Sequence, residues 1–270
     1  PDDPSQYMES ELALHEHIQA LNGLAAGATE LYPLLLKQED FWIDLAQLLS
    51  HENADVSQTV IKVLVEWLDP SLIETTESVM DLAKQAADTC VDLVVANLGR
   101  ITDDDDDGNG DDGNQWSDAV EDILTMMENL LGLAMDETIV ASIAKTPLIS
   151  WLVEQISTSE SEFADRSTEL LALLWQQPLL WENNTWKELT RIPKYTSSLV
   201  ETPEPVPNKN GNDDDDKPTT TIDALEVILQ AVAKFRKKQP SSEMEVDYLE
   251  NLCTALASAL TLVGKPLVDA

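Results

Sequence analysis

Hydrophobic residues between positions 41 and 68 recur at the spacing of two short α-helices joined by a turn. Within each helix they fall on one side, because residues three, four and seven apart share a helix face. Asn53 lies in the polar turn, where its side chain is suited to cap the second helix. Two helices with one apolar face each cannot bury both faces alone, so we expect this hairpin to pack against similar neighbours. The apolar positions are Phe41, Trp42, Leu45, Leu48 and Leu49 in the first helix and Val56, Val60, Val63, Leu64 and Trp67 in the second.

Three later segments repeat this arrangement of a short helix, a polar break and a longer helix. Repetition of one helical unit is typical of an α-solenoid, in which each unit packs against its neighbours. A single irregular helical bundle is the alternative. Aromatic residues and alternating β-branched runs are few, so we expect an all-α fold without a sheet. The short helices are expected at 90–98, 148–156 and 224–232, and the longer ones from Asp118, around Phe163 to Leu174, and around Tyr248 to Ala259.

The remaining segments divide the chain, which we interpret as a fragment, residues 1–270, of one longer superhelical domain. Residues 1–37 are expected to form N-terminal capping helices, at 8–21 with Leu12, Ile18 and Leu21 facing inward, and at 28–36 with Pro33 tolerated only in the first turn. The repeats are expected over residues 38–190. A segment rich in Pro, Asn, Asp and Thr at 194–221 predicts a disordered insertion, and residues 222–270 a further repeat.

A formal net charge of −35 changes the range of partners to expect. It disfavours direct, sequence-specific contact with nucleic acid, whose phosphates repel such a surface, and it favours basic protein partners. Simple solubility is an equally good explanation. Part of the charge lies in the segment 102–114, where Asp103, Asp105 and Asp107 match the first half of a calcium loop but Asn114 replaces the required Glu. We therefore expect a disordered acidic insertion there.

The remaining polar residues give little sign of chemistry. His15 and His17 are two residues apart and point to different sides of a helix, so we expect no metal site. Cys90 and Cys253 occupy core-like helical positions, typical of buried free thiols. No uninterrupted apolar run of eighteen residues indicates a membrane span. The basic cluster of Lys234, Arg236, Lys237 and Lys238 could contact RNA or an acidic segment, although cations are also favoured at a helix C-terminus.

No motif in the sequence supports catalysis. There is no G-x-S-x-G element, no phosphate-binding glycine loop, no H-E-x-x-H and no C-x-x-C pair. The three histidines provide no base beside a cysteine. Carboxylate pairs occur throughout so acidic a chain and are therefore uninformative. We expect a non-enzymatic protein without a cofactor.

Several stretches of the chain match the sequence motifs of one known protein family. The N-terminal match comprises Pro1, Asp2, Pro4, Tyr7, Met8, Glu9, Ser10, Glu11 and Leu12. The hairpin match comprises Leu48, Leu49, His51, Asn53, Asp55, Val56 and Ser57. Further matches are PLISWLVEQ, STELLALLWQQ, IDALEVILQAVAKFRKKQP and YLENLCTALASAL. They follow one another in order over nearly the whole chain, and together they resemble the nuclear beta-catenin-like protein family of the spliceosome. The two acidic insertions depart from the pattern of that family.

The resemblance implies an armadillo-like repeat fold and a scaffold role in the nineteen complex during pre-mRNA splicing. It also implies a nuclear location and recognition of basic localisation-type segments of splicing factors, among them the Myb-type CDC-five-like subunit. Homodimerisation of the full-length protein stays open. A transport adaptor or chaperone for basic cargo, outside the spliceosome, is the alternative with the same fold. We expect no membrane partner.

Carboxylates near the first hairpin are the candidate binding residues for such basic segments. From position and charge we select Glu52, Asp55, Glu66 and Asp69. Importin-like armadillo grooves pair Trp with Asn on the inner helices. Trp67 and Trp175 lie at equivalent ends of two long helices, but no Asn follows at the matching spacing, so an importin-type groove is not expected.

Overall fold

The computed structural model forms two compact units, residues 1–146 and 147–270. The structure describes residues 5–71, 76–103, 113–133, 137–158, 161–178, 180, 191–195, 221–236 and 239–263.

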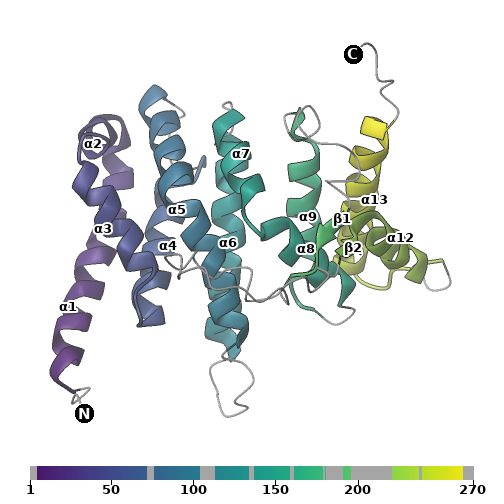
Figure 1. Cartoon of the computed structure of the whole chain (residues 1–270), viewed down its shortest axis with the longest axis horizontal. Helices are drawn as coiled ribbons and strands as arrows, with labels where there is room; N and C mark the ends of the chain where they lie inside the picture. Colours follow the sequence, from purple (N-terminus) through teal and green to yellow (C-terminus); the bar gives the residue numbers. More distant parts are fainter. Residues whose placement is uncertain are drawn as a thin grey trace, which may run out of the picture. The chain divides into compact units, whose positions relative to one another are not determined.

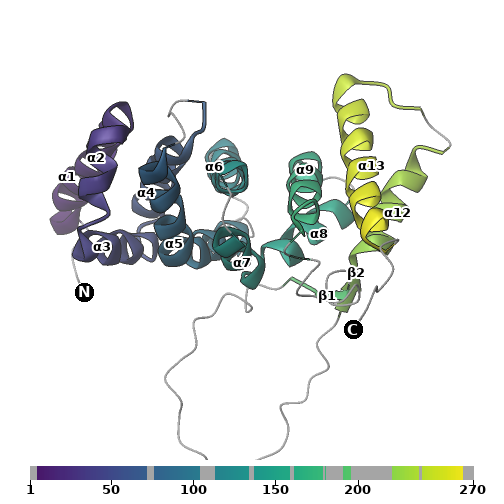
Figure 2. The same cartoon turned by 90° about the horizontal axis from the view of Figure 1, so that it is seen from above.

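The first unit is built entirely of helices within the described ranges (Figure 1). Its elements are α1 Ser5–Ala20, the 3₁₀ helix η1 Leu21–Gly27, α2 Ala28–Leu35, α3 Glu39–Leu49, α4 Ala54–Leu68, α5 Glu77–Asp103, α6 Gly113–Leu133 and α7 Glu137–Lys145. Helices α1, α4 and α6 form one row, and α3, α5 and α7 form the other (Figure 2). Helix α4 packs against α1, α3 and α6, and α5 packs against α3, α6 and α7.

The predicted hairpin is confirmed as α3 and α4. Asn53 caps α4, and its side-chain oxygen accepts a hydrogen bond of 2.9 Å from the Asp55 N–H. Val60, Val63 and Leu64 are fully buried, as the helical spacing predicts. The hairpin therefore contributes its apolar side to a core shared with α1, α5 and α6.

Side chains from other helices bond to the carbonyls that the ends of α3 and α4 leave without an intrahelical partner. The Asn97 amide donates to the Leu49 carbonyl at 3.1 Å, near the end of α3. At the end of α4, the Tyr32 hydroxyl donates to the Trp67 carbonyl at 3.0 Å, and the Asn129 amide donates to the Val65 carbonyl at 3.2 Å. These bonds fix where each helix ends relative to its neighbours.

The second unit combines helices with a short two-stranded sheet. Its helices are α8 Leu148–Ser157, α9 Ala164–Trp175, α12 Ala224–Lys234 and α13 Glu243–Val263. Strands β1 Arg191–Pro193 and β2 Thr221–Asp223 pair antiparallel, with Ile192 opposite Ile222. Helix α13 packs against α9 and α12, and α8 packs against α9 and α12. Asp223 at the end of β2 caps α12 by accepting hydrogen bonds from the N–H groups of Leu225 and Glu226.

The all-α prediction is confirmed in outline, but the expectation of no sheet is wrong. The β1–β2 pair joins two three-residue strands that lie far apart in sequence, too short to show an alternating pattern. Residues 90–98 do not form a separate short helix, because they belong to α5, which begins at Glu77. The following helix begins at Gly113 rather than Asp118, and α7 is an element that the sequence patterns did not predict.

The two expected insertions lie mainly outside the described residues. Residues 104–112 and 196–220 are not described. The ends of the insertions were placed too broadly, since residues 102–103 and 113–114 are helical and Thr221 begins β2.

Three residues lie in positions that differ from those expected from the sequence. Leu12 was expected inward but is 59% exposed, whereas Ile18 is buried as predicted. Cys253 is exposed on α13, whereas Cys90 is buried, and burial raises the pKa of the Cys90 thiol to about 12. Pro33 lies in the second turn of α2, where the buried neighbour Tyr32 and its hydrogen bond to α4 hold the helix in place.

Candidate protein-binding surface

The four predicted acidic residues lie at the two ends of α4 and do not form one cluster. Glu52 and Asp55 lie at its start, and Glu66 and Asp69 lie at its end. Glu66 follows Asp55 by eleven positions, which corresponds to about 16 Å along a helix. A single basic side chain therefore cannot contact both pairs.

The pair at the end of α4 has roles within the fold. The Asp69 carboxylate accepts a hydrogen bond of 2.7 Å from the Ser71 N–H in the turn that ends the helix. Glu66 is half-buried near Tyr32. Burial, and then the negative charge of Glu66, raise the pKa of Tyr32 to about 12. These two acids are thus less suited to a partner than the pair at the start of α4.

The pair at the start of α4 is exposed. Arg100 of α5 donates to the main-chain carbonyls of His51 at 2.7 Å and Glu52 at 3.2 Å, which holds the turn before α4 in place. Asn53 in the same turn donates to the Glu11 carboxylate of α1 at 3.0 Å. The sequence patterns did not identify Glu11, because its position beside α4 depends on the packing of two helices about forty residues apart.

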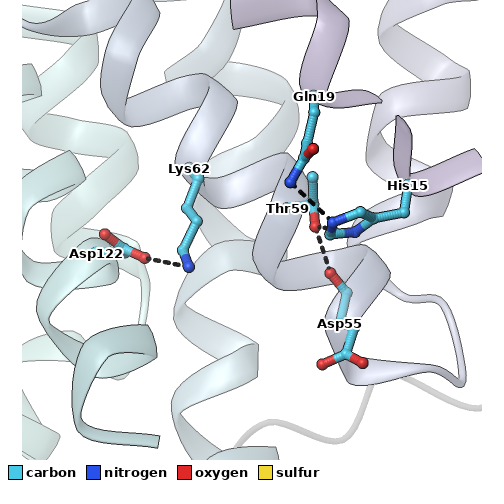
Figure 3. A network of polar contacts seen from close by, with 6 residues as sticks. All are labelled: His15, Gln19, Asp55, Thr59, Lys62 and Asp122. Carbon is cyan, nitrogen blue, oxygen red and sulfur yellow. Dashed lines mark hydrogen bonds and ion pairs between the residues drawn. The ribbon is translucent and has the colours of Figure 1, made fainter. Parts of the chain in front are cut away.

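A polar network joins α1 to α4 (Figure 3). The Thr59 hydroxyl lies 2.6 Å from the Asp55 carbonyl, to which it donates, so its oxygen can accept from His15 Nδ1 at 2.8 Å. That arrangement places the proton of a neutral imidazole on Nδ1 and leaves Nε2 to accept from the Gln19 amide at 2.8 Å. His15 is therefore part of the α1–α4 contact.

The charged pair of Lys62 and Asp122 extends this face from α4 to α6 (Figure 3). Their charged atoms are 3.9 Å apart, which is an ion pair without a close hydrogen bond. Burial of the Asp122 carboxyl raises its pKa, the charges of Asp118 and Glu121 raise it further, and Lys62 opposes the shift. The acidic side chains of α6 at this point therefore outnumber the one lysine of α4 that pairs with them.

In the second unit, charged residues lie at the junction of α9, α12 and α13. A hollow of about 380 Å³ is lined there by Asp165, Lys234, Phe235 and Tyr248, among others. Burial, and then the charge of Asp165, raise the pKa of Tyr248, while a hydrogen bond with Thr168 opposes the shift. Lys234 ends α12, and Lys237 and Lys238 of the predicted basic cluster lie outside the described residues.

The two tryptophans at the ends of long helices, Trp67 and Trp175, are both fully buried. The indole N–H of Trp67 donates to the Leu21 carbonyl at 2.9 Å. These two residues therefore fill the core.

Within the described ranges, no three His, Cys, Asp or Glu side chains gather as ligands of a metal ion. Within the same ranges, no single helix is both long and apolar enough to cross a membrane, and only α7 and α8 taken together meet that length and composition.

Comparison with known proteins identifies relatives over nearly the whole chain. Residues 1–265 match the family described as catenin-beta-like, Arm-motif containing nuclear. The beta-catenin-like protein 1 of Rattus norvegicus is 27% identical over 269 residues, and that of Homo sapiens is 26% identical over the same length. The beta-catenin-like protein 1 homolog of Schizosaccharomyces pombe is 24% identical over 259 residues.

The matches cover much more of this chain than of its relatives. They include 97% of the chain but 39% of the rat and human proteins, and 94% of the chain but 38% of the yeast homolog. The chain therefore corresponds to less than half of the length of these relatives.

Proposed function

The chain belongs to the catenin-beta-like family of nuclear Arm-motif proteins, and from that premise we propose that it acts as a scaffold in the spliceosome-associated nineteen complex. In this role it binds basic localisation-type segments of splicing factors, including the Myb-type CDC-five-like subunit, and catalyses no reaction. The observation that carries the proposal is the family match over residues 1–265, together with the armadillo-like helical repeats.

The charge of the chain supports basic partners. A formal net charge of −35 attracts Lys-rich and Arg-rich segments and repels nucleic-acid phosphates. Exposed carboxylates at the start of α4, Glu52 and Asp55, provide candidate contacts on a rigid helical surface. The family description names nuclear proteins, which supports a nuclear location.

Affinity capture tests the proposal. The chain is immobilised and exposed to nuclear extract at moderate salt, and the bound proteins are identified. We expect a set of splicing factors that a lysine-rich peptide displaces and that a peptide of the same length without charge does not. Capture of import factors and unrelated basic cargo, without splicing factors, would instead support the alternative of a transport adaptor or chaperone.

A further inference from the structure

A hollow of about 380 Å³ lies between α1 and α4, on the face that carries the polar network of Figure 3. Ligand pockets span roughly 300–1,000 Å³, so this volume suits a few residues of one chain rather than a folded domain. Its lining includes Met8, Glu11 and Leu12 of α1 and Asp55 and Gln58 of α4. The hollow thus combines apolar, acidic and amide groups within a small space.

Gln58 supplies an unused hydrogen-bond donor. Its side chain lines the hollow although the residue is only 8% exposed, and its Nε2 is buried without a hydrogen-bond partner among the described residues. A buried donor without a partner loses its hydrogen bond to water and gains none in return, so native proteins rarely leave one. A ligand oxygen in the hollow would provide the missing acceptor.

Two exposed apolar side chains border the same hollow. Met8 is 67% exposed and Leu12 is 59% exposed, and one helical turn places them on one side of α1. Exposed apolar side chains that line a cavity with polar groups are typical of binding surfaces. This accounts for the failure of the expectation that Leu12 would face the core.

The charges of the hollow favour a cation. Glu11 and Asp55 both line it, and a carboxylate can accept several hydrogen bonds, so the bond from Asn53 leaves Glu11 able to accept more. The lysine of the lining, Lys62, is paired with Asp122 of α6. An anionic ligand would meet two carboxylates here, in a chain with a net charge of −35.

We propose that this hollow binds a short extended segment of a basic partner protein. A main-chain carbonyl of the segment accepts from Gln58 Nε2, an apolar side chain packs on Met8 and Leu12, and a Lys or Arg side chain pairs with Glu11 and Asp55. This assignment rests on the proposed function and gives it a location in the first unit. It also separates Asp55 from Glu66 and Asp69, which lie near the other end of the helix.

Replacement of Gln58 by Leu provides the sharpest test, because it removes the donor and keeps a similar volume. The probe is a fluorescein-labelled peptide Lys-Lys-Leu-Lys-Leu-Lys-Lys, titrated with the 270-residue chain and followed by fluorescence anisotropy. We expect Gln58→Leu to weaken binding about tenfold. Its melting temperature should equal or exceed that of the parent, because the lost donor has no partner to leave unpaired.

Charge variants provide the matched controls. Asp55→Asn and Glu11→Gln should each weaken binding by about threefold to tenfold. Asp92→Asn makes the same change at an exposed position of α5, outside the hollow, and should leave the affinity within twofold. If Gln58→Leu lowers the melting temperature, Leu12→Ser decides instead. Its side chain is largely exposed, so it should weaken binding without loss of stability.

The outcomes separate the two proposals. If the parent binds the peptide and the Gln58, Leu12 and Asp55 variants bind it equally well, the hollow is not the site and the proposed function stands. If the parent does not bind the peptide at all, recognition of basic segments fails together with the hollow. Weakened binding by these variants, with Asp92→Asn unchanged, supports both.

Discussion

Tyr32 links the N-terminal helices to the first hairpin through one hydroxyl group. It is fully buried, and it donates to the Trp67 carbonyl at the end of α4. Its ring also lies 6.4 Å from the Trp67 ring, measured between centroids. A single residue of α2 therefore packs against α4 and also provides a hydrogen-bond donor for a carbonyl at the end of α4.

Replacement of Tyr32 by Phe tests that link. At pH 7 we expect the free energy of unfolding to fall by about 1 kcal/mol, because the Trp67 carbonyl loses a buried partner. Burial and Glu66 raise the pKa of Tyr32 from 10.0 to about 12. Between these values the folded protein keeps a proton that the unfolded chain loses, so this contribution to stability decreases as pH rises through the window. Urea unfolding at pH 9 and pH 11 measures this effect. Between the two pH values, the free energy of unfolding should decrease less for Tyr32→Phe than for the parent.

Burial of the Asp122 carboxylate lowers the free energy of unfolding of the protein. Burial and two acidic neighbours raise its pKa above the ordinary 3.8, so its charged form is disfavoured in the folded state. The exposed Lys62 is 3.9 Å away, and pairs of this kind contribute only about 0–1 kcal/mol. The carboxylate therefore contributes less to stability than a neutral side chain of the same shape would.

Asp122→Asn should accordingly stabilise the protein at pH 7, by about 0.5 kcal/mol. The sign follows from linkage. A raised folded pKa means that stability decreases as pH rises from 3.8 through the folded pKa, so the gain should be smaller at pH 4 than at pH 7. Chemical unfolding at both values measures it, with Asp92→Asn as the exposed control. A clear loss of stability at pH 7 would show that the ion pair with Lys62 outweighs the cost of burial.

At the scale of elements, the helix starts depend on single capping residues. Asn53 caps α4 and also donates to Glu11 of α1, whereas Asp223 caps α12 through two main-chain N–H groups. Local signals of this kind can be read from sequence, and Asn53 was identified in that way. Asp223 follows the same rule but lies at the end of a strand that the patterns did not show.

Replacement of either cap by Ala should destabilise its unit by about 1 kcal/mol. Asn53→Ala also removes a hydrogen bond between α1 and α4, so we expect the larger effect there. Hydrogen exchange resolves the two cases, since Asn53→Ala should increase exchange in the first turn of α4 and in α1. An increase confined to α4 would mean that the Glu11 bond contributes nothing to the position of α1.

Local patterns predicted the elements well where one helix face decides the structure. The α3–α4 hairpin, α8, α9, α12 and α13 all carry the expected apolar stripe. Of helix α5, only residues 90–98 were predicted, although the helix begins at Glu77. In the structure Asp88 and Asp92 face solvent while Ala86, Ala87 and Val91 are buried against neighbouring helices, so tertiary packing extends the helix.

The candidate site was less predictable than the elements. Asp55 was selected from its charge, but the side chains opposite it belong to α1 and depend on how α1 packs on α4. The spacing of Met8, Leu12, His15 and Gln19 marks one side of α1 and is visible in the sequence. We expected Leu12, which lies on this side of α1, to face the core. That a helix has an apolar side can be read from its sequence, but what covers that side cannot.

At the scale of the whole molecule, the excess of 51 acidic over 16 basic residues acts on any basic partner before contact is made. Long-range attraction of this kind raises association rates, and salt screens it over about 10 Å at 0.1 M. The contacts of the proposed hollow act after docking and govern dissociation instead. The net charge and the proposed hollow therefore make two separable contributions to binding, the first to the association rate and the second to the dissociation rate.

Stopped-flow measurement with the labelled lysine-rich peptide can separate them. Between 50 and 500 mM salt we expect the association rate to fall by about tenfold or more, while the dissociation rate changes far less. A variant with Ser in place of the six aspartates at 104–107, 111 and 112 should lower the association rate at low salt and leave dissociation unchanged. Gln58→Leu should do the opposite, because its donor acts only on the bound peptide. If the six-aspartate variant changed dissociation as strongly as Gln58→Leu does, the acidic segment would itself contact the peptide, and the division between steering and docking would be wrong.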